Sequence, residues 1–172
     1  MVRRSRQAMV MEFSLNPLFV DLTDQPFRFF NILPKDWQED IVPFWGDYQS
    51  SSHVHGIELQ HEIVGGGIVF KQVAPDVQHY KDEAEKLLNL NLLYFAFLWV
   101  DPEMRGKNLG SWWISRLKEH YSPTTFWLSI EDVGLLDFYQ RNNFKVYKEI
   151  LIEHKKEWIL IPSDFTLPQE QF

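Results

Sequence analysis

The sequence contains no cysteine, which excludes disulfide bonds, thiolate metal ligands and a cysteine nucleophile. This absence suits a reducing compartment, and we expect a cytoplasmic protein. Long apolar runs are also missing: the longest is Leu92–Val100, far short of the roughly 20 residues that a membrane-spanning helix needs. Positive charge is scarce, because 17 Lys and Arg residues stand against 24 Asp and Glu residues, a formal net charge of −7. We therefore expect neither a membrane nor a nucleic acid as a partner.

The residues that are present suffice for one domain of ordinary size. The chain has 172 residues, of which 45% are apolar, and it is rich in aromatic side chains, with 14 Phe, 7 Trp and 6 Tyr. We predict a single domain over residues 1–172. Residues 1–12 are expected to form a disordered leader rather than a signal peptide, because Glu12 interrupts the apolar segment. Residues 162–172 are expected to form a polar tail.

The spacing of apolar residues predicts the order of helices and strands. A period of two predicts strands, and apolar residues three to four apart predict helices. The predicted elements are a strand at 27–33, a helix at 34–45, strands at 55–62 and 63–70, a helix at 76–90, a strand at 92–100, a helix at 112–121, a strand at 126–130, a helix at 135–141, and a hairpin of 145–153 and 157–161 around His154-Lys155-Lys156. This order predicts one mixed sheet with helices on its faces. The run Gly65-Gly66-Gly67 is interpreted as a bulge or a close approach within a strand, rather than as a phosphate loop.

A glycine-bearing loop follows the buried strand 92–100 and leads into the helix 112–121. It reads Arg105-Gly106-Lys107-Asn108-Leu109-Gly110-Ser111. It has neither the Walker spacing nor the G-x-G-x-x-G dinucleotide fingerprint. It does bring together small residues, two cations and the free N–H groups of a helix start, which is typical of an anion site. A phosphate or pyrophosphate site is one interpretation, and an ordinary strand–turn–helix joint is the other.

Two segments resemble the GNAT superfamily of N-acetyltransferases. The first, Val100–Ser111, looks like the family's acetyl-CoA-binding motif Gln/Arg-x-x-Gly-x-Gly/Ala, with Asn108 in place of the middle glycine. Asparagine tolerates left-handed backbone conformations better than most residues, so the loop can keep its shape. The second, Leu135–Phe144, is similar to the family's F-Y-E-K-x-G-F segment, with Asn143 where glycine is usual. That exchange is mild at a helix end.

The resemblance implies a fold and a way of binding acetyl-CoA. The implied fold is α/β (α+β): a single domain with a central mixed, mostly antiparallel twisted sheet of about six to seven strands, flanked by helices, with a V-shaped splay next to the central strand. Pantetheine would bond to the backbone in the V, pyrophosphate would bind the N–H groups of the loop, and a strand N–H would polarise the acetyl carbonyl. The implied acetyl-CoA-binding residues are Leu98, Trp99, Val100, Arg105, Gly106, Lys107, Asn108, Leu109, Gly110, Ser111 and Tyr139.

Candidate proton donors and acceptors follow from the same comparison. Tyr139 matches the family's usual general acid, which would protonate the departing CoA thiolate; the alternative is a half-buried core aromatic. Glu131, at the end of strand 126–130, is the candidate base, and a solvated strand-end carboxylate is the alternative. Glu58 and Glu62 are further base candidates, while Asp132 is expected to cap the following helix.

These features predict an acetyl-CoA-dependent N-acetyltransferase that moves an acetyl group to a primary amine by direct attack in a ternary complex. The acceptor is expected to be a small or peptidic amine, and the acidic balance favours a cationic one. We expect no metal, because His53, His55 and His61 fit no zinc spacing. Segment 76–90 would cover the acceptor cleft or form a homodimer surface. Aromatic residues of the N-terminal half would build the acceptor side: Phe27, Phe29, Phe30, Trp37, Phe44, Trp45 and Tyr48.

Two other classes of function stay open at this point. One is a non-catalytic module that binds CoA or acyl-CoA with the same fold, for which Asn108 would be a sign of drift. The other is a structural or interaction protein that has the fold and no ligand. CoA binding without thiol release favours the first, and a melting temperature that acetyl-CoA does not raise favours the second.

Overall fold

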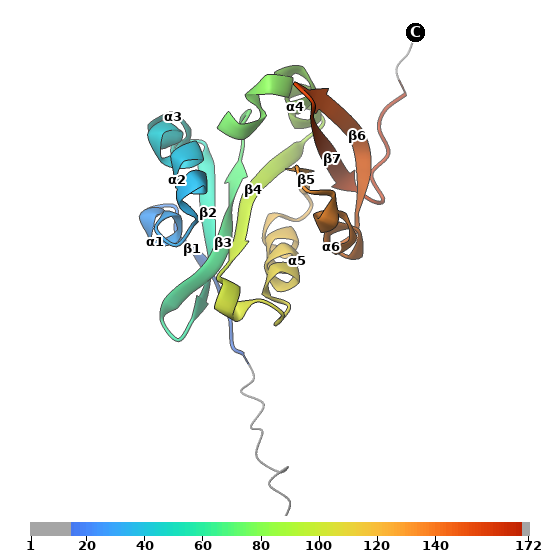
Figure 1. The fold of residues 1–172 in the computed structure, drawn as a ribbon. Helices are drawn as coiled ribbons and strands as arrows, with labels where there is room; N and C mark the ends of the chain where they lie inside the picture. The colour runs from blue at the N-terminus through green and yellow to red at the C-terminus, as the bar shows by residue number, and fades with distance from the viewer. Residues whose placement is uncertain (1–14, 170–172) are drawn as a thin grey trace, which may run out of the picture.

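A seven-stranded sheet organises the part of the chain that the computed structural model describes, residues 15–169 (Figure 1). The expected leader at 1–12 lies outside the described residues, as do residues 170–172 of the tail. Within 15–169, no helix is long and apolar enough to cross a membrane. The elements are β1 (Leu18–Asp21), α1 (Phe27–Phe30), α2 (Lys35–Ile41), η2 (Val42–Phe44), α3 (Trp45–Tyr48), β2 (Ser52–Leu59), β3 (Glu62–Phe70), η3 (Pro75–Tyr80), α4 (Lys81–Asn89), β4 (Leu92–Val100), η4 (Pro102–Met104), α5 (Leu109–Tyr121), β5 (Thr125–Ile130), η5 (Val133–Leu135), α6 (Leu136–Arg141), β6 (Phe144–Ile152) and β7 (Lys155–Pro162).

The sheet splays open between strands β4 and β5. Its strand order is β1-β2-β3-β4-β5-β7-β6, and every neighbouring pair is antiparallel except β4 and β5. That parallel pair is short, because only Leu92–Tyr94 lie opposite Thr125–Trp127. Beyond these residues the two strands diverge. The predicted mixed, mostly antiparallel sheet and its V-shaped splay are therefore confirmed.

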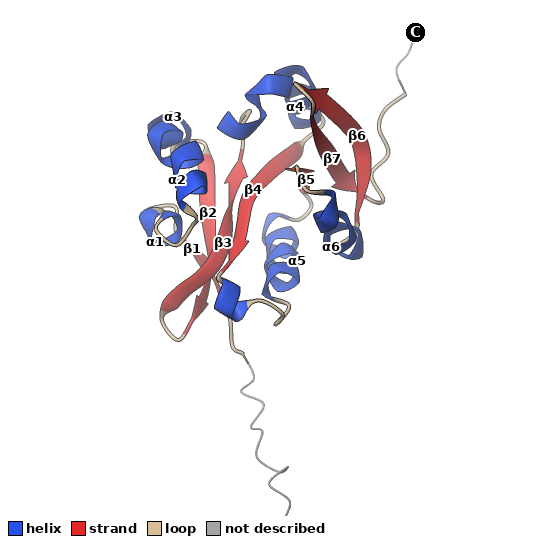
Figure 2. Ribbon diagram, in the orientation of Figure 1, coloured by secondary structure: helices blue, strands red, loops and turns tan. Residues whose placement is uncertain are grey.

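Helices cover the two faces of the sheet and define two cores (Figure 2). Helices α1 to α4 contribute to the first core, with Phe29 and Leu87 fully buried. Helices α5 and α6 contribute to the second, with Trp113 at its centre. Strand β4 serves both: the buried side chain of Tyr94 belongs to the first core and that of Phe95 to the second. The single α/β domain is thus assembled around β4.

The predicted strand at 27–33 is wrong, because residues Phe27–Phe30 form helix α1. Pro26 starts the turn with a φ of −65°, the value that its ring favours and that a helix requires. Phe29 and Phe30 are both fully buried, which adjacent residues on a half-exposed strand could not be. Burial against the sheet therefore selects the helix.

Two further predictions need correction. Residues 76–90 do not form one helix, because the 3-10 helix η3 ends at Tyr80 and α4 begins at Lys81. In the tight 3-10 spiral, residues three apart lie above one another, so Val77 and Tyr80 both enter the core. In the last hairpin, His154 lies in the turn as predicted, but Lys155 and Lys156 are the first residues of β7. The tip is Glu153-His154, both with positive φ as a two-residue hairpin turn requires.

The glycine run of β3 marks a bulge and a close approach, as predicted. Between Gly66 and Ile68 the register with β4 shifts, so that Gly67 lies opposite two residues of β4. A Cβ atom on Gly67 would lie 2.6 Å from the Trp113 ring. That ring is fully buried, and its Nε1 donates a hydrogen bond of 3.1 Å to the His55 carbonyl oxygen. Moving the ring away would therefore cost free energy.

Gly67→Ala is therefore expected to destabilise the protein by about 1–3 kcal/mol, because it overpacks this contact. At this chain length, the melting temperature should fall by roughly 2–4 °C per kcal/mol. Gly46→Ala is the matched control: a Cβ atom there meets nothing within 4 Å, and alanine favours the α3 helix. Thermal unfolding of both variants tests the contact, and equal melting temperatures would contradict it.

Candidate functional site

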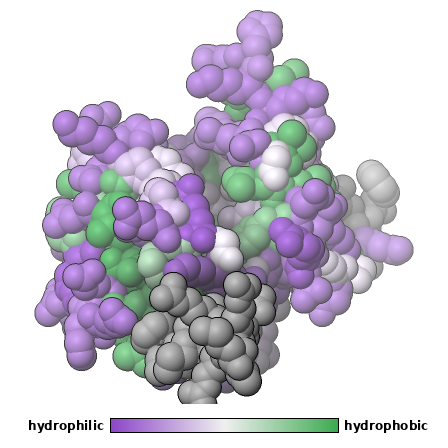
Figure 3. Space-filling view, turned by 60° about the horizontal axis from the view of Figure 1, so that its bottom comes forward, coloured by the Kyte–Doolittle hydropathy of each residue, from purple (hydrophilic) through white to green (hydrophobic). Residues whose placement is uncertain are grey.

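A cleft of about 380 Å³ opens where β4 leaves β5. Figure 3 shows a hollow between the two halves of the molecule. Helix α2 contributes residues on one side, and η5 and α6 on the other, while β4 and β5 line the middle. The lining draws on both faces of the sheet, because it includes Tyr94 from the first core and Tyr139 from the second. The volume is that of pockets that bind small ligands.

Strand β4 presents backbone groups without a strand partner in this cleft. Beyond Tyr94 it is paired only with β3, so the groups that point towards β5 have no ladder partner. Phe97 has a φ of 58°, and Phe97 and Leu98 together lie opposite Gly67. A bulge leaves one residue unpaired, and a bulky residue with positive φ is a strained feature of the kind found at functional sites. This is the place on β4 where a backbone N–H can donate to a ligand.

The loop between β4 and α5 presents further open donors. Gly106 and Asn108 have φ angles of 76° and 63°. Asn108, the N-cap residue of α5, thus takes the left-handed conformation that asparagine tolerates, and no side chain caps the helix. The first bond of the helix runs from the Trp112 N–H to the Asn108 carbonyl oxygen at 3.0 Å. The N–H groups before Trp112 have no acceptor in the helix and lie at its positive end, an arrangement that suits an anion.

Side chains on both flanks hold this loop in place. The Arg105 Nε donates to the Val100 carbonyl oxygen at 2.9 Å, and the guanidinium lies 4.4 Å from the centroid of the Trp99 ring. On the other flank, the Asn142 Nδ2 donates to Ser111 Oγ at 3.0 Å. These contacts join the loop to the end of β4 and the first turn of α5 to the end of α6.

Tyr139 enters the cleft from α6. Tyr139 is 8% exposed. Its ring centroid lies 6.4 Å from that of Phe95 and 6.3 Å from that of Phe144. Within residues 15–169, the Tyr139 hydroxyl makes no hydrogen bond, so it can donate its proton to a ligand. Burial raises the pKa of Tyr139, and the phenol therefore stays protonated at neutral pH.

Solved structures resemble this architecture. No protein-family model and no curated protein matches the sequence. An aminoglycoside 6'-N-acetyltransferase complexed with coenzyme A is similar with a TM-score of 0.61 and 12% identity, over 88% of this chain and 99% of that one. An aminoglycoside 6'-acetyltransferase type Ii gives the same TM-score and coverage at 13% identity. A GNAT family acetyltransferase from Elizabethkingia anophelis with acetyl-CoA bound gives a TM-score of 0.55 and 10% identity, over 85% and 96%. The chain has the GNAT fold.

Within the GNAT fold, the segments expected to bind acetyl-CoA adjoin one another. Leu98 lines the cleft, and Trp99 and Val100 complete β4. Residues 105–108 follow η4 directly, whereas residues 109–111, predicted as loop, form the first turn of α5. Tyr139, the candidate general acid, lines the same cleft as β4, the strand expected to bind acetyl-CoA.

The candidate bases do not all lie in the cleft. Glu131 lines the cleft but is exposed at the end of β5. Glu58 lies on β2, 3.8 Å from Arg28 in an ion pair, and Glu62 is exposed at the start of β3. Neither Glu58 nor Glu62 is among the residues that line the cleft. Asp132 caps the 3-10 helix η5, because it accepts a hydrogen bond of 2.8 Å from the Gly134 N–H. The helix it was expected to cap, α6, starts after η5 with Leu135 as N-cap and no side-chain cap.

The aromatic residues of the N-terminal half divide between two roles. Trp37 lines the cleft, and its ring meets those of Phe97 and Trp99 edge-on, with centroids 5.9 and 5.4 Å apart. Phe30 and Trp45 instead lie in the first core. Of the seven aromatic residues expected on the acceptor side, Trp37 is the one that lines this cleft.

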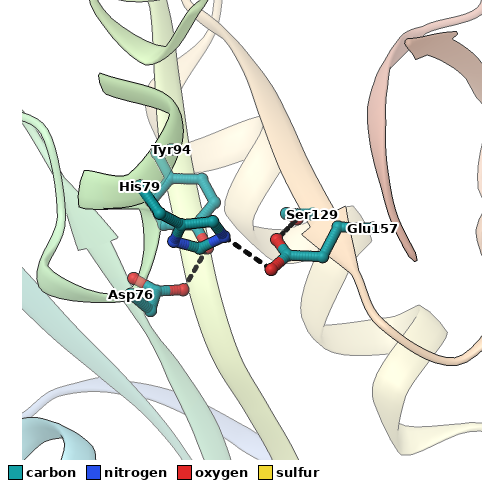
Figure 4. A network of polar contacts seen from close by, with 5 residues as sticks. All are labelled: Asp76, His79, Tyr94, Ser129 and Glu157. Carbon is teal, nitrogen blue, oxygen red and sulfur yellow. Dashed lines mark hydrogen bonds and ion pairs between the residues drawn. The ribbon is translucent and has the colours of Figure 1, made fainter. Parts of the chain in front are cut away.

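A network of polar contacts that the sequence did not reveal lies where β4 and β5 part (Figure 4). The Tyr94 hydroxyl donates to Asp76 Oδ2 at 2.5 Å. Next to this pair, Glu157 Oε1 lies 2.6 Å from the His79 Nε2, and Glu157 Oε2 accepts a bond of 3.3 Å from the Ser129 hydroxyl. Asp76, Tyr94 and Ser129 all line the cleft. A tyrosine within the most apolar run of the chain was the one available signal, because a buried phenol needs a hydrogen-bond partner.

The charge of the cleft is negative. Its described lining residues include no Lys, Arg or His, and five carboxylates contribute: Asp36, Asp40, Asp76, Glu131 and Asp132. Such a lining concentrates cations, and it disfavours an acidic substrate group.

Proposed function

We propose that the chain is an acetyl-CoA-dependent N-acyltransferase that moves an acetyl group to a primary amine by direct attack in a ternary complex. The observation that carries the proposal is the cleft between β4 and β5, where a bulged strand with unpaired backbone groups faces a protonated tyrosine. Two solved structures that share the fold support it, one complexed with coenzyme A and one with acetyl-CoA bound.

The proposed roles follow from the donors that the chain offers. The N–H groups of the loop from Arg105 to Ser111 would bind the pyrophosphate, and the cations Arg105 and Lys107 would add attraction. The backbone of Leu98, Trp99 and Val100 would hold the pantetheine arm. A backbone N–H near the bulge would stabilise the negative charge that develops on the carbonyl oxygen.

Proton transfer would involve two groups. The amine must lose a proton to attack, and Glu131 is the candidate base expected from its place at the end of β5, on the cleft edge. The Tyr139 hydroxyl would give its proton to the departing thiolate sulfur. A cationic acceptor suits the negative lining of the cleft. A cytoplasmic location and a homodimer stay predictions.

Acetyl-CoA at about 100 times its Kd is expected to stabilise the protein by about 2.7 kcal/mol, a rise in melting temperature of roughly 5–10 °C. The same protein should release free thiol from acetyl-CoA with a panel of primary amines that includes n-butylamine, 1,4-diaminobutane and lysine. Thermal unfolding and a colorimetric thiol assay measure the two effects. An unchanged melting temperature would reject CoA binding altogether. A rise without thiol release across the panel would indicate a non-catalytic CoA-binding module.

A further inference from the structure

Asp76 is a carboxylate that the fold does not satisfy. Its Oδ2 accepts the hydroxyl of Tyr94, but its Oδ1 is shielded from solvent and has no hydrogen-bond partner within residues 15–169. An unpaired carboxylate oxygen in such a place destabilises a protein. The residue also lines the cleft beside Tyr94 and Ser129. A donor supplied by a ligand in the cleft would complete the site.

The surroundings of Asp76 make it a proton acceptor. Burial, with the negative charge of Glu157 adding to it, raises the pKa of Asp76 to about 6, against the opposing effects of the Tyr94 hydroxyl, the residue's own backbone N–H and His79. The carboxylate is thus ionised at pH 7 to 8 and still basic enough to hold a proton. Tyr80 of η3 is a further ionisable group next to Asp76. The same cleft is also lined by the carboxylates of Asp36, Asp40, Glu131 and Asp132 and by the Tyr139 hydroxyl.

We propose that Asp76 receives the proton of the acceptor's ammonium group, and that it does so from the face of the sheet opposite Tyr139. This inference rests on the proposed acyl transfer. It assigns the base to a partly buried residue of η3 in place of the exposed Glu131. Tyr94 is the positioning residue, because its hydroxyl holds Oδ2, and a turn of the carboxyl group about that bond would bring the shielded Oδ1 to the ammonium N–H. The absence of basic side chains from the described lining lets the acceptor enter as a cation.

The step balances without any further reactant. The ammonium gives one proton to the Asp76 carboxylate, and the nitrogen lone pair then forms the C–N bond to the acetyl carbon. As the C–S bond breaks, the sulfur takes the proton of the Tyr139 hydroxyl. The second proton of the nitrogen returns through solvent to the tyrosine oxygen. The products are the amide and the free thiol, and the proton on Asp76 leaves to solvent.

Asp76→Asn is expected to lower kcat with the fastest amine of the panel by about 100-fold or more, and to leave the thermal shift produced by acetyl-CoA unchanged. In the original protein, kcat/KM for the amine should fall as pH drops through about 6, and Asp76→Asn should lose this limb. Asp76→Glu should recover part of the rate. Asp24→Asn, an exposed aspartate outside the cleft, is the matched control and should change neither rate nor profile.

A measurement without substrate separates this role from a structural one. Because the pKa of Asp76 is raised from 3.8 to about 6, the folded protein loses stability as pH rises through that window, where the unfolded chain ionises first. Asp76→Asn should therefore melt at a higher temperature than the original protein at pH 8, and not at pH 3.5. A lower melting temperature at pH 8 would make Asp76 a structural partner of Tyr94 and overturn the inference.

The activity assays keep the two proposals apart. Loss of kcat in Glu131→Gln with full activity in Asp76→Asn would return the base to Glu131 and overturn the inference alone. A protein whose melting temperature acetyl-CoA does not raise would overturn the proposed function, and the inference with it. Thermal stabilisation by acetyl-CoA, an amine-dependent thiol release and its loss in Asp76→Asn would support both.

Discussion

Replacement of Tyr139 by phenylalanine is expected to lower kcat by about 100-fold or more, and to leave the Kd for acetyl-CoA within about twofold of its original value. The phenol lines the cleft, and burial raises its pKa, so it carries a proton for the departing thiolate at neutral pH. The substitution removes one oxygen and keeps the ring contacts with Phe95 and Phe144. Stability should therefore hardly change. Thiol release gives kcat, and calorimetry gives Kd.

Tyr147→Phe is the matched control for this change. Its hydroxyl donates to Glu83 Oε2 at 3.2 Å on the outer strand β6, and it does not line the cleft. Its kcat should equal that of the original protein. An unchanged kcat in Tyr139→Phe would leave Tyr139 as a core aromatic. A weaker Kd with an unchanged kcat would make it a residue that binds acetyl-CoA and takes no part in proton transfer.

The continuous part of the candidate site could be predicted from the sequence. Strand β4, the loop and α5 follow one another along the chain, so the apolar run 92–100, the small and basic residues of 105–111 and the spacing of 112–121 report them locally. The same holds for Asp132, whose cap bond spans two residues. Gly67 signals a close neighbour because it lacks a side chain, although only the structure shows that this neighbour is Trp113.

The part of the site that depends on long-range contacts could not be predicted. Asp76 and Tyr94 are 18 residues apart, and His79 and Glu157 are 78 apart, so no local pattern pairs them. The wrong prediction of a strand at 27–33 has a related cause. A run rich in phenylalanine suits a strand as well as a helix, and the choice is made by the buried surface that the run covers. Local spacing cannot report that surface.

Ser111→Asp is expected to weaken acetyl-CoA binding by about 100-fold or more, and to leave the unliganded protein at least as stable as the original. Ser111 is the third residue of α5 after the N-cap Asn108, where N–H groups have no acceptor within the helix. A carboxylate there accepts from those donors and favours the helix by about 0.3–1 kcal/mol. For the same reason it competes with pyrophosphate and repels its charge. A variant that is at least as stable without ligand and yet binds acetyl-CoA more weakly would indicate an anion site at the start of α5.

Ser115→Asp is the matched control, because it adds the same charge to an exposed position about one turn further along α5. Its Kd should stay within about threefold of the original. A substitution at Gly110 would be a poorer test, since a Cβ atom there would lie 3.1 Å from the Phe138 ring. Calorimetry and thermal unfolding measure the two effects. Equal Kd values for the two aspartate variants would place the anion away from the first turn. A less stable Ser111→Asp would trace the defect to the bond with Asn142, because charge alone predicts the opposite sign.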